Sequence, residues 1–336
     1  MKLANTYVIG TLVMWYEIEM LEEHVDACLQ MLNGVDNPEN ITFHYCFNCQ
    51  EYLERIDQSI HGENADITYK RFLQQMMRLE SVGALVMINV QRASDPFFNI
   101  ARFRRTLNFE YCEKVDYVLW GETDSLWPAS ALTIIESVHE RAAPTTPKFL
   151  LTFAYRRNWD SSWDGLVHPM FESIPFADDD EFVLNNEASE KSYMSMARMN
   201  EINDVPLNDI TIVPRFEPKA DGSCLVISSD LIRSGVNIPH GIIHNAEDIA
   251  MCEQAKLVMG HLFVQYHVSN ILRVHNRRHP RKRTGIMDEN NPSGFCDDRK
   301  GSWWKMLESS SNYNHQHLRN QTKLLKVDEV IRGLGK

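Results

Sequence analysis

The sequence predicts an α/β domain built on a largely parallel sheet with helices on its faces, followed by a helical extension at the C-terminus. Over the first 150 residues, short apolar runs alternate with longer segments whose apolar residues recur at helical spacing. Strands that alternate with helices imply parallel pairing through right-handed crossovers. At 336 residues, the chain can hold one large domain of this class with an elaborated C-terminal part.

The expected elements follow one another along the chain. Short apolar runs predict strands at 6–14, 41–47, 84–90, 117–120 and 148–155. Amphipathic spacing predicts helices at 17–32, 67–80, about 97–113 and 129–142. The region 156–210 is irregular and is interpreted as an inserted loop. After it we expect a strand at 223–229, a short helix from Asp230, a helix beginning near Ala246, a strand pair around 261–275 and a polar helical tail at 301–336.

Composition and charge narrow the classes of function. The formal net charge of −12 disfavours nonspecific nucleic-acid binding by the whole surface, although it leaves room for a local basic groove. The chain has no N-terminal signal pattern and no run of about 18 apolar residues, so we expect no membrane span and a cytoplasmic location. Seven cysteines without framework spacing suit a reducing compartment. The Cys46–Cys49 CxxC has no second pair and is interpreted as two ordinary cysteines.

The stretch 117–128 carries the first candidate site. The apolar run YVLW stops at two carboxylates spaced one residue apart, Glu122 and Asp124. Acidic residues at the carboxyl end of a buried strand project into the crevice where open α/β sheets bind ligands. An acid-x-acid pair there suits a hard divalent cation that also holds substrate phosphates, although a simple polar turn has the same composition. The chain has no GxGxxG and no GxxxxGK, so a bound nucleotide would need a metal for phosphate neutralisation.

A second acidic pair, Glu247 and Asp248, lies in the first turn of the helix expected near Ala246. Carboxylates are favoured there by the helix dipole, which alone accounts for their presence. The functional interpretation is that one of them accepts a proton from a hydroxyl nucleophile.

The third candidate is basic. Six Lys or Arg residues lie between positions 273 and 283, and arginine suits bidentate contacts to phosphate. His275 ends an apolar run, where a neutral imidazole can ligate a metal. His267 has the same chemistry but lies in mid-strand, where a packed histidine is expected. A further arginine cluster, Arg102, Arg104 and Arg105, precedes the YVLW strand and faces either phosphate or solvent.

Taken in this order, the motifs resemble the GT-A glycosyltransferases, particularly the family-2-like group. The resemblance covers roughly residues 6–283, with 156–210 unmatched. It implies a Rossmann-like mixed, mostly parallel sheet in a catalytic domain at 1–285, followed by a helical tail at 286–336. Within that domain, 1–128 is the nucleotide-sugar half and 129–285 the acceptor half.

The resemblance also implies roles for residues. Glu122 and Asp124 stand in the place of the family's DxD motif and are expected to contact the donor. Glu122 replaces the first Asp of that motif, which usually contacts the sugar or ribose, and Asp124 and His275 match metal ligands. Glu247–Asp248 matches the ED pair, with Asp248 as the general base. Donor contacts are implied for the residues nearest the family's remaining donor positions and for the basic loop: Arg105, Asn48, Tyr16, Arg277 and Arg278.

The implied activity is transfer of a sugar from a nucleoside-diphosphate sugar, most simply a UDP-sugar, to an acceptor hydroxyl with Mn²⁺ or Mg²⁺, with inversion of the anomeric configuration expected. The acceptor is a glycan, a small molecule or, in a phage-type enzyme acting in the host cytoplasm, a hydroxymethylated DNA base. Segments 273–283 and 153–171 would grip such DNA. Alternatives from other classes are a noncatalytic sugar-nucleotide or nucleic-acid binding protein and a nucleotidyltransferase.

Overall fold

The structure is a computed structural model that describes residues 1–14, 17–48, 65–92, 95, 98–157, 160–171, 193–243, 246–276 and 302–322. Within these residues, the centre is an eight-stranded sheet in the order β3-β2-β1-β4-β8-β6-β9-β7. The strands are β1 (Tyr7–Met14), β2 (Ile41–Asn48), β3 (Leu85–Gln91), β4 (Tyr117–Glu122), β6 (Phe149–Ala154), β7 (Ile212–Arg215), β8 (Leu225–Ser228) and β9 (Val264–Leu272).

The first four strands pair in parallel, and the other half of the sheet is mixed. Strand β8 runs antiparallel between β4 and β6, β9 is parallel to β6, and β7 closes the edge antiparallel to β9. The predicted α/β class with a mixed, mostly parallel sheet is therefore confirmed.

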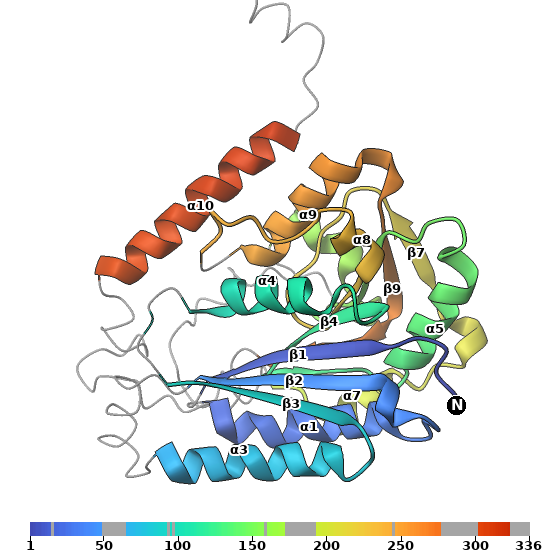
Figure 1. Cartoon of the computed structure of the whole chain (residues 1–336). Helices are drawn as coiled ribbons and strands as arrows, with labels where there is room; N and C mark the ends of the chain where they lie inside the picture. Colours follow the sequence, from blue (N-terminus) through green and yellow to red (C-terminus); the bar gives the residue numbers. More distant parts are fainter. Residues whose placement is uncertain are drawn as a thin grey trace, which may run out of the picture.

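Helices cover both faces of the sheet (Figure 1). They are α1 (Ile18–Leu32), α3 (Ala65–Glu80), α4 (Ile100–Tyr111), α5 (Ala131–Ala142), α7 (Met196–Ile202), α8 (Ser229–Arg233), α9 (Glu247–Met259) and α10 (Ser302–Thr322). Helices α1 and α3 lie on one face of β1–β3, and α4 lies on the other (Figure 1). Short 3-10 turns are η2 (Pro38–Asn40), η3 (Ser161–Leu166), η5 (Leu207–Asp209) and η6 (Gly260–Leu262).

Strand β1 divides the hydrophobic core because successive side chains point to opposite faces. Tyr7 and Ile9 join the cluster under α1, α3 and α5, whereas Val8 joins the cluster with α4, α8 and α9. At Gly10, a Cβ atom would lie 2.1 Å from a methyl group of Leu107 on α4. Only glycine permits this close approach, which presses α4 onto the sheet beside the end of β4.

Two predicted segments differ from the structure. The strand pair expected around 261–275 is wrong as a pair: β9 belongs to the main sheet, and the short β10 (Val274–His275) pairs instead with β5 (Ser125–Leu126). The irregular region 156–210 contains η3, α7 and η5, and it leads into the edge strand β7. This strand was not predicted because it is only four residues long.

The expected helical tail is represented by α10, which packs against α9 (Figure 1). Leu307 of α10 is buried, and the Asn314 amide donates to the Gly241 carbonyl at 2.8 Å. No helix among the described residues is long and apolar enough to cross a membrane.

Candidate active site

The site is built on a short antiparallel ribbon at the end of β4. Strand β5 pairs with β10 so that His275 lies opposite Ser125. The Ser125 hydroxyl donates to the Glu122 carbonyl at 2.7 Å and accepts from the Glu122 amide at 3.0 Å, which holds the turn between β4 and β5. The backbone amide of Asn276 donates to the Asp124 carbonyl at 2.7 Å. These backbone contacts place residues far apart in sequence against the same turn.

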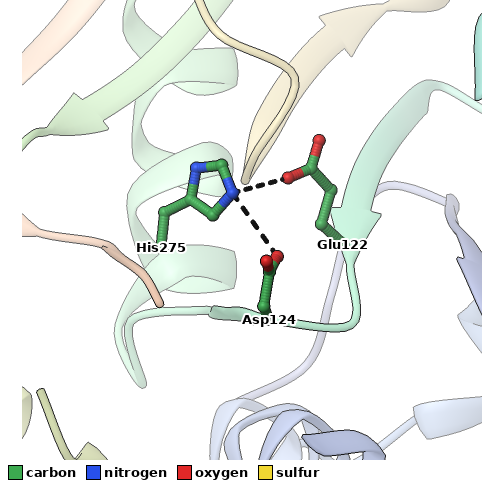
Figure 2. Close-up of side chains that lie close together, drawn as sticks. All are labelled: Glu122, Asp124 and His275. Atoms are coloured by element: carbon green, nitrogen blue, oxygen red, sulfur yellow. Dashed lines mark ion pairs between the residues drawn. The ribbon is translucent and has the colours of Figure 1, made fainter. Parts of the chain in front are cut away.

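Glu122, Asp124 and His275 converge at this turn (Figure 2). The Nε2 atom of His275 lies 2.9 Å from Glu122 Oε2 and 3.4 Å from Asp124 Oδ1. One ligand atom from each residue lies within 4.8 Å of the others. Two carboxylates and an imidazole are a mixed oxygen and nitrogen donor set, which fits a divalent ion such as Mn²⁺. The residues predicted for the DxD-like motif and the late histidine are thus brought together.

The charges of the cluster depend on one another. Burial alone would raise the pKa of Glu122, but the positive charges of His275 and Arg104 outweigh it and lower that pKa to about 2. Burial likewise disfavours the imidazolium, yet Asp124 and Glu122 raise the pKa of His275 to about 10. In the metal-free protein, the imidazolium is therefore the cation between the two carboxylates.

Arg104 connects this cluster to the second acidic pair. Its guanidinium is buried and donates to Glu122 Oε1 at 2.6 Å, to Glu247 Oε1 at 2.5 Å and to the Gly222 carbonyl at 2.6 Å. The guanidinium also lies over the Trp120 ring, 4.9 Å from its centroid. A Cβ atom at Gly222 would fall 1.9 Å from Arg104 Nη1, so glycine is what lets the two approach.

The acidic pair at the start of α9 faces the same region. Asp248 Oδ2 accepts from the Gly222 amide at 2.8 Å, and Oδ1 accepts from the Ile249 amide at 2.7 Å. The preceding Ala246 has a left-handed backbone at φ 62° and makes no side-chain cap. Burial, with Glu247 and Asp221 nearby, raises the pKa of Asp248 to about 8, and burial also raises that of Glu247. Asp248 therefore contributes one bond to the first turn, while Glu247 points to Arg104.

The ionisable groups of this region include more acidic than basic side chains. When all are ionised, five carboxylates are balanced by two guanidinium groups and one imidazolium, which leaves two negative charges in excess. These groups are Glu122, Asp124, Asp221, Glu247, Asp248, Arg104, Arg273 and His275. Unbalanced charge is costly in a partly buried place, so a divalent cation suits the region electrostatically as well as by donor type.

Other predicted residues lie elsewhere. Arg105 donates to the carbonyls of Ile238, Pro239 and Ile242 at 2.6–2.9 Å, contacts that hold a loop and do not favour the expected donor role. The arginine that reaches the acidic turn is Arg104, one position earlier. Arg102 is half exposed and pairs with Asp95.

Asn48 ends β2 and is buried, with its amide donating to Met14 Sδ at 3.5 Å, so its donor role stays a prediction. Tyr16, Arg277 and Arg278 lie outside the described residues, as does Cys49. His267 is packed in β9, as expected, with Nδ1 3.1 Å from the Thr152 hydroxyl. Burial together with Arg215 and Arg273 lowers its pKa to about 3.

Asp221 was not expected at the site, and Arg273, expected to contact phosphate or DNA, is paired with it instead. Asp221 Oδ2 lies 3.5 Å from His275 Nδ1 and accepts a hydrogen bond from Arg273. The available signal was an acidic residue beside an apolar strand, the same as at Glu122. Because β8 is antiparallel to β4, with Leu225 opposite Trp120, the start of β8 lies at the edge where β4 ends.

No protein-family model and no curated protein matches the chain. Similar solved structures include Staphylococcus aureus TarS residues 1–349, with 10% identity, 79% of this chain covered and a TM-score of 0.43. The chain spans 60% of the length of that TarS chain. Glucosyl-3-phosphoglycerate synthase from Mycobacterium tuberculosis is 12% identical, with 91% of this chain and 79% of that chain covered and a TM-score of 0.40.

GalNAc-T7, solved with UDP, GalNAc and Mn²⁺, is 8% identical, with 93% of this chain and 54% of that chain covered and a TM-score of 0.42. These three proteins are GT-A glycosyltransferases, the class that the sequence resembles. TM-scores of 0.40–0.43 describe a partial likeness of fold. The functional proposal therefore rests on the residues of the site.

Proposed function

We propose that this protein is a metal-dependent glycosyltransferase that moves a sugar from a nucleoside-diphosphate sugar to an acceptor hydroxyl. The observation that supports it most strongly is the linkage through Arg104. This buried guanidinium joins Glu122 of the candidate metal cluster to Glu247, the neighbour of the candidate base Asp248. A donor-diphosphate site and a proton acceptor side by side are what such a reaction requires.

Glu122, Asp124 and His275 would hold the divalent ion. When bound, the ion would neutralise negative charge that develops on the departing diphosphate. Glu122 therefore joins Asp124 and His275 as a proposed ligand, because its Oε2 faces the imidazole while its Oε1 is occupied by Arg104. This differs from the sugar or ribose contact of the family's first Asp.

Asp248 would take the proton of the acceptor hydroxyl while that oxygen attacks the anomeric carbon, with inversion as the expected outcome. Its pKa of about 8 makes it a stronger base than an ordinary aspartate. Glu247 is engaged by Arg104, so its proposed part is electrostatic: its charge raises the basicity of Asp248. In this proposal Asp248 is the base and Glu247 tunes its basicity.

Among the candidate acceptors, a DNA base gains no support from the described residues of the segments expected to grip it, and 277–283 lie outside those residues. Arg273, Tyr155 and Trp163 are all buried, and Arg273 is paired with Asp221. These side chains cannot stack on or grip DNA without rearrangement. A glycan or small-molecule hydroxyl, with a UDP-sugar as donor, is the simpler proposal.

The test is a panel of UDP-, GDP- and CMP-sugars assayed with Mn²⁺ or Mg²⁺ for nucleotide release and for donor binding. We expect Asp124→Ala to abolish metal-dependent donor binding. Asp248→Asn should keep that binding and lower transfer by about 10²- to 10⁴-fold. The exposed Asp209→Asn is the matched control.

Three results would count against the proposal. Binding of a sugar nucleotide without any turnover by the wild type would favour a noncatalytic binding protein. Incorporation of a nucleotidyl group would identify a nucleotidyltransferase. Loss of both binding and transfer in Asp248→Asn would indicate that Asp248 has a structural role.

A further inference from the structure

Asp221 belongs to none of the motifs that the sequence resemblance supplies, yet it lies at the centre of the site. It stands three residues before the buried Cys224 that precedes β8, and its side chain is only 4% exposed. An aspartate so deeply buried requires partners for both of its oxygens.

Both oxygens accept a hydrogen bond from a described residue. Asp221 Oδ1 accepts from the Ser223 amide at 3.1 Å. Oδ2 accepts from the Arg273 guanidinium and faces His275 Nδ1 at 3.5 Å. Arg273 is itself fixed, because its guanidinium carbon lies 4.2 Å from the centroid of the Tyr155 ring. The carboxylate is thus held in place before it meets the imidazole.

The two nitrogens of His275 face opposite acidic groups. Nε2 faces Glu122 and Asp124, and Nδ1 faces Asp221. A histidine that ligates a metal through one nitrogen commonly donates the other N–H to a carboxylate, which sets the tautomer and the ring orientation. Asp221 is also connected to the candidate base. The next residue, Gly222, accepts a hydrogen bond from Arg104 through its carbonyl and donates one to Asp248 through its amide.

We propose that Asp221 is a positioning residue that holds the Nδ1–H of His275 and leaves the Nε2 lone pair directed at the divalent ion. This inference rests on the proposed function, because it requires the ion to bind at Glu122, Asp124 and His275. It adds a carboxylate outside the ligand set as a determinant of metal affinity.

Asparagine is the informative substitution because it preserves shape and removes one acceptor. In Asp221→Asn, the amide NH₂ must point either at the Ser223 N–H or at the Arg273 and His275 donors, so one donor faces another. We expect Mn²⁺ affinity, measured by the electron paramagnetic resonance of free Mn²⁺, to fall about 10- to 100-fold. The exposed Asp209→Asn should bind Mn²⁺ like the wild type. Thermal melting without metal checks that each variant is folded.

The second measurement needs no variant of Asp221. In ¹⁵N-histidine-labelled wild type saturated with Zn²⁺, a diamagnetic ion that imidazole and carboxylates both ligate, His275 should carry its proton on Nδ1. The His275→Ala spectrum identifies the signal. This readout stands even if Asp221→Asn does not fold.

The outcomes separate the inference from the proposed function. Wild type that binds Mn²⁺ while Asp221→Asn binds it within about twofold would overturn the inference alone. Absence of the proton from Nδ1 of His275 in the Zn²⁺-loaded wild type would also overturn the inference alone. Wild type that binds neither ion would overturn the metal-dependent function, and the role of Asp221 with it.

Discussion

Replacing Arg104 by methionine tests whether one buried cation holds the site together. Methionine retains much of the side-chain length and packing but leaves Glu122 and Glu247 without their shared partner. Breaking a buried ion pair by removing one member typically costs about 3–5 kcal/mol. A chain of 336 residues has an unfolding entropy of about 0.7 kcal/mol/K near 60 °C, so we expect the melting temperature to fall by about 4–7 °C.

The assay is thermal unfolding at neutral pH and one fixed scan rate. Arg102→Met is the matched control on the same helix, because Arg102 pairs with Asp95 while half exposed and such pairs contribute about 0–1 kcal/mol. Adding Glu247→Gln to Arg104→Met should recover part of the loss, since it removes one uncompensated charge. If Arg104→Met melted at the same temperature as Arg102→Met, the reasoning about a shared buried cation would be refuted.

Three further predictions concern the base and the glycine beside it. Because the pKa of Asp248 is raised to about 8, transfer should fall roughly tenfold for each pH unit below that value, and a rate that stays flat down to pH 6 would contradict Asp248 as the base. The raised pKa also means that the folded state binds the proton more tightly than the unfolded state. This stabilisation is complete below the unfolded pKa of 3.8 and is lost as pH rises to about 8, so chemical denaturation should show Asp248→Asn gaining stability relative to wild type between about pH 4 and 8 and no further gain above it. Gly222→Ala places a methyl group 1.9 Å from Arg104 Nη1 and should lower the melting temperature by about 1–4 °C, from an overpacking cost of about 1–3 kcal/mol. Gly241→Ala meets only the amide of Asn314 at 3.0 Å, so equal losses in the two variants would argue against a steric effect at Arg104.

Much of the fold was predictable because its signals are local. The strands β1, β2 and β4 are short apolar runs buried on both faces, and the helices that follow them are amphipathic. The edge strand β7 was missed because four half-exposed residues that include a proline have no such pattern. Apart from the exact boundaries, the periodicity of apolar residues was sufficient to predict the elements that are long and packed against the core.

The site was only partly predictable because it depends on how elements meet. Glu122, Asp124 and His275 were identified from their order along the chain. Arg104 could not be chosen over Arg105, since neighbouring helix positions differ by about 100° and the face is set by the contact of α4 with Gly10. Asp221 could not be placed either, because nothing local reveals that β8 runs antiparallel to β4.

The connection between β9 and β10 has a consequence for how this chain can vary in length. A single residue, Arg273, separates the end of β9 at Leu272 from the start of β10 at Val274. The main sheet anchors one side of this connection, and the pairing of His275 with Ser125 anchors the other. An insertion or deletion of one residue there would turn His275 to the opposite face of the ribbon. Surface loops of proteins generally tolerate changes in length, whereas this connection cannot change by one residue while the site stays intact.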